Sequence, residues 1–378
     1  FVHTARIAIS SECDGVEINA GQHSLVRQFL SGLTNHRDDA WGQDKTLFAR
    51  TIIEKIRKEI GNAAIGLRLS CDELAPWAGI TPDMAVELAP QLAACGLDYL
   101  VVVRGSIFSI EKTRPDFHEP EGFNTEITQR IQAVLNIPVF LQGSIVQSHM
   151  AIQAVEQGVC AGVEMTRAQI ADPDLVNKIL NGDVEKIRPC IRCNQTCQVR
   201  DARNPIVTCV VEPTSGHEST DPNWYTQVAP KKVAVIGAGP AGLEAAYTAA
   251  RRGHSVEVYE QKSNAGGIAA FAGPGGAFVH WLYEHCLSLN VKFHFGAHVD
   301  GTQDLAADVV LQCTGSRLGV PTYAIPDHTA AIDVVDVMNS STALPESGDI
   351  VLHDPIGGPI AIALAQWLGP RAILVTQD

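Results

Sequence analysis

The sequence predicts an α/β protein in which two regions of alternating strands and helices are joined by a cysteine-bearing segment. Three observations predict this fold class. Residues 1–187 alternate short β-rich runs with helical stretches, which is typical of parallel β/α architecture. Four cysteines follow between residues 190 and 209, in a stretch with little apolar periodicity. From Lys231 the chain again runs as strand, glycine-rich turn, helix and strand.

Five β-rich runs in the first region are expected as parallel strands. They are DGVEIN (14–19), AIGLRLS (64–70), YLVVV (99–103), PVFLQG (138–143) and AGVEM (161–165). Helices are expected over 45–60, 82–94, 125–135 and 146–157, and Thr81 and Pro82 are typical residues for the start of the second. Five strands are too few to close an eight-stranded barrel, so an open sheet and the later part of a barrel remain alternatives.

Length and composition indicate a globular protein of two or three domains. The 378 residues are 46% hydrophobic and 19% charged, which is enough apolar material for substantial cores. The net charge of −14 argues against binding to nucleic acid or to anionic membranes. The sequence contains no run of about 18–20 apolar residues and no signal-peptide pattern at residue 1, so we expect a soluble cytoplasmic protein.

The four cysteines are candidate metal ligands. Cys190, Cys193, Cys197 and Cys209 are separated by two, three and eleven residues. Four thiolates can hold structural zinc or an iron–sulfur cluster, and the spacing favours the cluster only slightly; disulfides are least expected in a reducing cell. Residues 188–229 are therefore expected to be a connector held together by a metal rather than by a core.

A dinucleotide-binding motif opens the second region, residues 230–320. Gly237, Gly239 and Gly242 follow the strand VAVI and precede an Ala-rich helix, an arrangement that lets a pyrophosphate approach the helix N-terminus. Glu260 ends the next strand, where it is expected to accept hydrogen bonds from the ribose hydroxyls. Gly267 comes soon afterwards, as in versions of the fold that bind FAD rather than NAD.

Residues 321–378 are predicted to begin a second nucleotide-binding domain of degenerate sequence. The segment DIVLHDPIGGPIAIALA (349–365) again reads as strand, turn and helix. Asp354, Ile356 and Pro359 occupy the positions where glycines are expected, and an acidic residue there would repel a pyrophosphate. We therefore expect a structural remnant or an altered adenosine site rather than a working NAD(P)H site.

Several segments together resemble the multidomain flavoproteins related to 2,4-dienoyl-CoA reductase and trimethylamine dehydrogenase. These segments are CDGVEINAGQHSLVRQFLSGLTNHRDDAWG (13–42), GLRLS, IADPDLVNKILNGDVEKIRPCIRCNQTC and GAGPAG, in the family's order. The resemblance implies an FMN-binding (β/α)8 barrel of which residues 1–187 form the C-terminal part. It also implies a [4Fe–4S] cluster on the connector, FAD in the next domain, and a chain that lacks both ends of the family's full length.

The resemblance implies two groups of FMN-binding residues. Arg68 matches an arginine beside the flavin pyrimidine, where positive charge stabilises the reduced flavin; a strand-end salt bridge is the alternative. Gly143 with Ser144, and Thr166 with Arg167, match the phosphate-binding turns. Ser144 stands where the family usually has arginine, so Arg167 is expected to carry the main phosphate-binding charge.

The predicted catalytic residues are Asn19, Gln22 and His23. Family members usually have Tyr or His and then His at the first two positions, whereas two amides cannot act as general acids near neutral pH. Other candidate proton donors are Tyr99, His118 and Arg104. Loss of the acid and of the NAD(P)H motif favours oxidation of a small N-methylated amine, with electrons passing from FMN through the cluster to FAD or a protein acceptor.

Two other functions remain open. One is an NAD(P)H-dependent reductase of enones or enoyl thioesters, and the other is an electron-transfer subunit without substrate chemistry. The expected partners are a small-molecule substrate and an electron-transfer flavoprotein or another protein acceptor, and the oligomeric state is left open.

Overall fold

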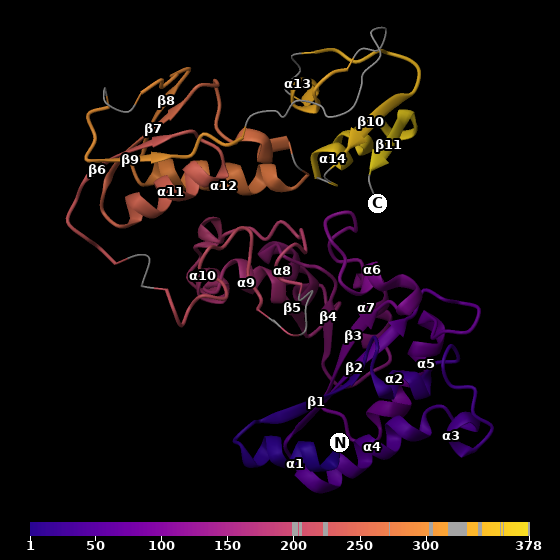
Figure 1. The fold of residues 1–378 in the computed structure, drawn as a ribbon. Coiled ribbons are helices and arrows are strands. Elements are labelled where there is room, and N and C mark those ends of the chain that lie inside the picture. Colours follow the sequence, from indigo (N-terminus) through magenta and orange to yellow (C-terminus); the bar gives the residue numbers. More distant parts are fainter. Residues whose placement is uncertain are drawn as a thin grey trace. The chain divides into compact units, whose positions relative to one another are not determined.

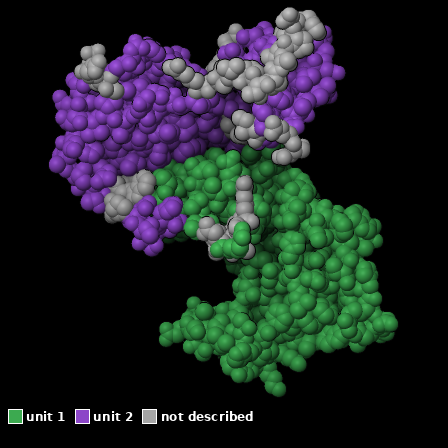
Figure 2. Space-filling view, in the orientation of Figure 1, with its two compact units in different colours: residues 1–215 green, residues 216–378 purple. Residues whose placement is uncertain are grey.

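The structure is a computed structural model in which residues 1–198, 203, 206–221, 226–271, 273–301, 305–316, 331–338, 342–355, 357 and 359–376 are described. The chain divides into two compact units, residues 1–215 (unit 1) and residues 216–378 (unit 2), which Figure 2 colours separately. Their boundary lies inside the expected connector, because the cysteine-bearing part of that segment clusters with the preceding strands and helices.

A five-stranded parallel sheet forms the centre of unit 1, with its strands in chain order (Figure 1). The strands are β1 (Gly15–Ala20), β2 (Ala64–Asp72), β3 (Tyr99–Arg104), β4 (Val139–Gln142) and β5 (Gly162–Glu164). All five expected strands are confirmed to within two residues at each end. Parallel pairing between consecutive strands requires a crossover after each strand, and these crossovers contain the helices.

Ten α-helices are present among the described residues of unit 1. They are α1 (Val2–Ser10), α2 (Leu25–Leu30), α3 (Ala40–Gln43), α4 (Leu47–Ile60), α5 (Pro82–Ala93), α6 (Ile110–Thr113), α7 (Thr125–Gln132), α8 (Ser148–Glu156), α9 (Thr166–Ala171) and α10 (Leu175–Leu180). Thr81 caps α5 as expected, since its side chain accepts a hydrogen bond from the Met84 N–H at 3.3 Å. The apolar stripe of α4 is buried through Ile52, Ile53 and Ile56.

The two faces of the unit 1 sheet differ in character. Alternate residues of β2 and β3, such as Leu67, Leu69 and Leu100, are fully buried against the helices. The other face carries the polar side chains described below. On this inner face Gly66 leaves room for the ring of Tyr99, because a Cβ at Gly66 would lie 2.1 Å from that ring. Alternation of large and small residues of this kind fills the interior of β/α barrels.

Unit 2 contains a four-stranded parallel sheet in the order β8-β7-β6-β9. Its elements are β6 (Lys232–Ile236), α11 (Pro240–Arg251), β7 (Ser255–Glu260), α12 (Gly275–Ser288), β8 (Lys292–Phe295) and β9 (Val309–Gln312). The expected succession of strand, turn, helix and strand from residue 231 is confirmed. Buried Val233, Val235, Val256 and Val258 form the core under Leu243 of α11.

The described residues of the last part of unit 2 form a two-stranded parallel sheet and two α-helices. Its elements are α13 (Val334–Met338), β10 (Ile350–Asp354), α14 (Pro359–Leu368) and β11 (Ala372–Thr376). The strand and helix expected within 349–365 are confirmed. Among the described residues of both units, none of the helices combines the length and apolarity that crossing a membrane requires.

Candidate active site and cofactor sites

A pocket of about 910 Å³ opens on the inner face of unit 1, beside the C-terminal end of β1. Asn19, Gln22, His23 and Arg68, which the sequence singles out separately, all line it. The rest of its wall comes from residues 110–119, which follow β3, and from Cys193, Asn194 and Gln198 of the cysteine segment. Its size lies within the range of about 300–1,000 Å³ that is usual for ligand and cofactor sites.

The loop that carries the predicted catalytic residues is held by hydrogen bonds at several points. Asn19 Oδ1 accepts from the Gly21 N–H at 2.8 Å, and Gln22 Nε2 donates to the Arg104 carbonyl oxygen at 2.5 Å. His23 adopts a left-handed backbone conformation with φ of 59°, which is uncommon outside glycine. Both amides therefore have fixed orientations at the pocket wall, and the local turn is a specific conformation rather than an extended loop.

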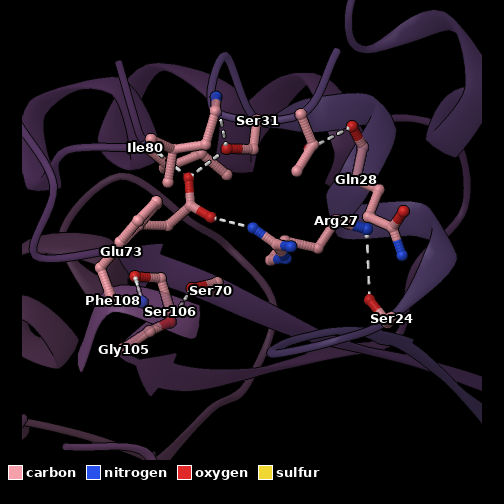
Figure 3. Close-up of polar contacts among 12 residues, drawn as sticks. Ser24, Arg27, Gln28, Ser31, Ser70, Glu73, Ile80, Gly105, Ser106 and Phe108 are labelled. Atoms are coloured by element: carbon pink, nitrogen blue, oxygen red, sulfur yellow. Dashed lines mark hydrogen bonds and ion pairs between the residues drawn. The ribbon is translucent and has the colours of Figure 1, made fainter. Parts of the chain in front are cut away.

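A buried ion pair anchors α2 behind this loop. Arg27 of α2 is 4% exposed and pairs with the fully buried carboxylate of Glu73, which follows β2. Figure 3 shows the Glu73 carboxylate between Arg27 and Ser31, whose hydroxyl also donates to it. The Ile80 N–H donates to the same carboxylate at 2.7 Å. Glu73 thus ties α2 to the loop between β2 and α5.

Arg68 combines the two alternatives that the sequence left open, because it lines the pocket and also forms ion pairs. Its Nε donates to Glu17 Oε1 at 2.7 Å, and its Nη1 donates to Glu164 Oε2 at 2.9 Å. Its Nη2 donates to the second oxygen of Glu164. The hydrogen bond with Glu164 is the main cause that raises the pKa of Arg68, and partial burial only partly opposes it.

The residues expected to bind phosphate lie together, but their side chains are already engaged with the protein. Ser144 follows Gly143 in a left-handed conformation with φ of 58°. Arg167 Nη2 donates to Ser144 Oγ at 2.6 Å, while its Nη1 donates to the Pro115 carbonyl oxygen at 2.8 Å. Thr166 is the first residue of α9. Burial is the main cause that lowers the pKa of Arg167.

The other three proton-donor candidates fall into two groups. His118 lines the pocket, and its Nδ1 lies 2.8 Å from Asp116 Oδ1. Partial burial raises the pKa of Asp116, but hydrogen bonds from the His118 N–H and ring outweigh it and give a net lowering. Tyr99 and Arg104 are not among the residues that line this pocket. The first donates to Glu17 at 3.4 Å, and the second pairs with Asp72 at 3.2 Å.

The four predicted metal ligands surround one small pocket. Cys190, Cys193, Cys197 and Cys209 all line it as free thiols, together with Arg167. Among the residues that the structure describes, no group of three or more His, Cys, Asp or Glu is already arranged to hold a metal ion. Four thiols are a donor set that either structural zinc or an iron–sulfur cluster can use, and the choice between the two stays a prediction.

The surroundings of these thiols also fit a cluster. The Arg192 N–H donates to Cys190 Sγ at 3.4 Å, and hydrogen bonds of this kind to sulfur tune cluster potentials. Burial is the main cause that raises the pKa of Cys190 to about 11, so the free thiol is protonated at neutral pH. A metal or cluster held by these cysteines would bind their thiolate forms, so its binding would release protons.

The small and large pockets share two residues, Cys193 and Asn194. Asn194 Oδ1 accepts from Arg167 Nη1 at 2.6 Å, and its Nδ2 donates to the Arg114 carbonyl oxygen at 2.6 Å. Asn194 therefore fastens the cysteine segment to α9 and to the loop after β3. Sequence reasoning missed this residue and also Glu164; the one local signal for Asn194 is its place directly after Cys193.

In unit 2 the three glycines of the turn have different surroundings. A Cβ at Gly237 would lie 2.3 Å from the carbonyl oxygen of Cys313, and a Cβ at Gly242 would lie 1.9 Å from that of Gly237. A Cβ at Gly239 would meet no atom within 4 Å. Gly237 and Gly242 are thus required for packing, whereas Gly239 faces the open space that a pyrophosphate would need.

Glu260 and Gly267 lie against the same turn. Glu260 is 9% exposed, and its carboxylate accepts from the Ala238 N–H at 2.7 Å and from the Lys262 N–H at 2.9 Å. A Cβ at Gly267 would lie 3.2 Å from the Gly239 Cα. The turn, its acidic residue and the following glycine therefore lie together, and their role in binding a dinucleotide stays a prediction.

The degenerate motif is partly described. Asp354 is 7% exposed, and its Oδ1 accepts from the Gly357 N–H at 3.0 Å. Its carboxylate thus stabilises the turn after β10. Ile356 lies outside the described residues, and Pro359 is the first residue of α14.

Comparison with known proteins identifies the family. Residues 1–185 match the model of the NADH:flavin oxidoreductase / NADH oxidase family, and residues 235–295 match the NAD(P)-binding Rossmann-like domain. The whole chain is 31% identical to "NADH oxidase" of Thermoanaerobacter brockii and 31% identical to "Probable N-methylproline demethylase" of Rhizobium meliloti (strain 1021), covering 60% and 58% of them.

A solved structure agrees with these matches. A 2-naphthoyl-CoA reductase in complex with 2-naphthoyl-CoA matches 99% of the chain and 58% of its own length, at 27% identity and a TM-score of 0.88. The chain spans about three fifths of the length of the curated relatives it matches. The barrel alternative and the resemblance inferred from the sequence are confirmed: residues 1–185 belong to the NADH:flavin oxidoreductase / NADH oxidase family, and a Rossmann-like domain follows them in the chain.

Proposed function

We propose that this chain forms the catalytic and electron-transfer part of an oxidoreductase that oxidises a small N-methylated amine. The observation that carries the proposal is that the 910 Å³ pocket and the four-cysteine pocket share Cys193 and Asn194. FMN in the larger pocket would supply two-electron oxidation, and a [4Fe–4S] cluster on the four cysteines would supply one-electron transfer towards FAD or a protein acceptor.

The groups at the pocket wall support oxidation of an amine. Asn19 and Gln22 hold their amides in fixed orientations, so they can position a substrate by hydrogen bonding without supplying a proton. The His118–Asp116 pair lies in the same pocket and can accept the proton that a protonated amine must lose first. The relative named as a probable N-methylproline demethylase is in keeping with this substrate class.

An NAD(P)H-dependent reductase of enoyl or enone substrates is the second candidate. The same His118–Asp116 pair favours it, because a protonated imidazole can donate the proton that reduction of a carbon–carbon double bond requires. The structural similarity to a 2-naphthoyl-CoA reductase supports it as well. An electron-transfer subunit without substrate chemistry is less favoured, because the pocket is large and lined by polar groups.

Rapid-mixing reduction of the full-length protein separates the two enzymes. Under anaerobic conditions, sarcosine, N-methylproline and dimethylamine are each mixed with the oxidised protein, and flavin absorbance is followed. To test for a reductase, NADH and NADPH are supplied as reductants of the flavin, and cinnamate is supplied as the substrate that reoxidises it. Rapid bleaching by at least one amine is expected. Bleaching by NADH or NADPH alone, followed by reoxidation of the flavin with cinnamate, would contradict the proposal.

Metal analysis tests the cluster separately. Iron and acid-labile sulfide are measured per chain in the wild type and in Cys193→Ser, with Cys13→Ser as the control, because Cys13 is exposed and lies outside the pocket. Iron and sulfide in equal amounts are expected in the wild type and the control, with a large loss in Cys193→Ser. Stoichiometric zinc without sulfide would refute the cluster.

A further inference from the structure

We propose that Glu164 makes a flavin in the large pocket harder to reduce by neutralising Arg68, a cation of β2 that lines this pocket. The inference rests on the proposed function in that it requires a flavin there. Neither the motifs nor the resemblance singles out Glu164. Without its partners Arg68 would make a flavin easier to reduce, and Glu164 reverses that effect.

The geometry leaves Arg68 few free donors. A guanidinium has five N–H groups in a planar fork. In Arg68, one goes to Glu17 and two go to the two oxygens of Glu164, so that two of the five remain for a ligand. Because the Glu164 pairing uses both terminal nitrogens, it also sets the plane of the guanidinium.

The charge balance of this group is the second step. One guanidinium and two carboxylates carry formal charges of +1 and −2, which leaves a net charge of −1. Reduction adds negative charge to a flavin, and a net negative group beside it opposes that change. An arginine without carboxylate partners would favour reduction of the flavin, and this is the role that the resemblance implied for Arg68.

Burial makes the effect large enough to measure. The side chains of Arg68 and Glu164 are each 26% exposed, and that of Glu17 is 28% exposed. Charges that are largely shielded from water interact more strongly and are screened less by salt than charges on the surface. Removal of one carboxylate charge from this group is therefore expected to shift the midpoint potential of a bound flavin even at moderate ionic strength.

Glu164→Gln is the informative substitution. It removes one negative charge while keeping the size of the side chain and one acceptor oxygen for the guanidinium. Glu17→Gln removes the same charge from the other side of Arg68 and is the second variant. Glu59→Gln is the control, because it removes a carboxylate from the exposed ion pair with Arg6 on the helices outside the sheet.

The midpoint potential of the flavin decides the outcome. It is measured by anaerobic spectroelectrochemical titration of the full-length protein, wild type and the three variants, in low and moderate salt. A shift to more positive potential is expected in Glu164→Gln and Glu17→Gln, and none in Glu59→Gln. If Glu164→Gln does not retain its flavin, the sign of the Glu17→Gln shift tests the same charge balance.

An unchanged or more negative potential in Glu164→Gln with bound flavin would overturn the inference, as would a negative shift in Glu17→Gln. These results leave the proposed function standing. The proposed function would fail on different results, namely a wild-type protein that binds no flavin or a bound flavin that none of the amines can reduce.

Discussion

Arg68 on β2 and Glu164 on β5 form a two-point ion pair although β3 and β4 lie between their strands in the sheet. In a flat sheet, strands three positions apart are separated by about 14 Å, which is more than two side chains on one face can readily span. The sheet must therefore be curled, so that the inner sides of β2 and β5 face each other. This curvature is the geometry of a partial barrel.

The curled inner face predicts a strong effect at Gly66. In Gly66→Ala the new methyl group would lie 2.1 Å from the ring of Tyr99, so the ring must move, and overpacking of this kind costs about 1–3 kcal/mol. Urea unfolding of Gly66→Ala, Tyr99→Leu and the double variant measures the effect. We expect the double variant to be more stable than the sum of the two single changes indicates. Simple additivity would show that these positions do not share the inner layer.

The Arg27–Glu73 pair predicts a large loss of stability when one partner is removed. Arg27→Met leaves a carboxylate without its cation in a fully buried position, and breaking a buried pair costs about 3–5 kcal/mol. Arg37→Met is the control, because its ion pair with Asp39 is exposed, and no measurable change is expected. Thermal unfolding monitored by far-UV circular dichroism compares the two. Equal shifts would contradict the anchoring role of Glu73.

The two hydrogen bonds of Asn194 predict graded retention of iron. Asn194→Leu removes both, whereas Asn194→Asp keeps the acceptor for Arg167 and loses only the donor to the Arg114 carbonyl. We expect the amounts of iron and sulfide that remain after aerobic dialysis to be highest in the wild type, lower in Asn194→Asp and lowest in Asn194→Leu. Asn177→Leu, which alters an exposed asparagine on α10, should match the wild type. Unchanged retention in Asn194→Leu would exclude this fastening role.

The turn in unit 2 predicts opposite results for two glycines. In Gly242→Ala the methyl group would lie 1.9 Å from the Gly237 carbonyl oxygen, so the turn must be distorted and the unfolding temperature should fall. In Gly239→Ala the methyl group meets no protein atom and φ is −75°, so stability should be kept. The same methyl group would occupy the space for a pyrophosphate, and FAD content should drop. Full FAD content in Gly239→Ala would place the dinucleotide elsewhere.

Much of the fold follows from patterns that are local in the chain. The strand runs from Gly15 to Glu164 and the turn at Gly237 were predictable because apolar alternation and glycine spacing act over a few residues. The cysteine set was equally visible as a group. Zinc and an iron–sulfur cluster could not be separated by spacing, because the distances between thiols depend on how the segment folds back on the barrel.

The candidate site was only partly accessible to the same reasoning. Asn19 lies on β1, Gln22 lies in the turn after it and Arg68 lies on β2, and sequence motifs placed them in one pocket only through the resemblance. Glu164 carries no local signal, since it is one acidic residue at the end of a short strand. Its pairing with Arg68 depends on a contact between residues 96 positions apart.

Sequence alone was sufficient for the order of the elements, the glycine turn and the identity of the four thiols, because neighbouring residues encode each of these. Only the tertiary structure decided that the thiol pocket and the large pocket meet at Cys193 and Asn194, and that Arg68 is neutralised by Glu17 and Glu164. The physical reason is curvature: the bending of a five-stranded sheet brings together side chains that no pattern along the chain relates to one another.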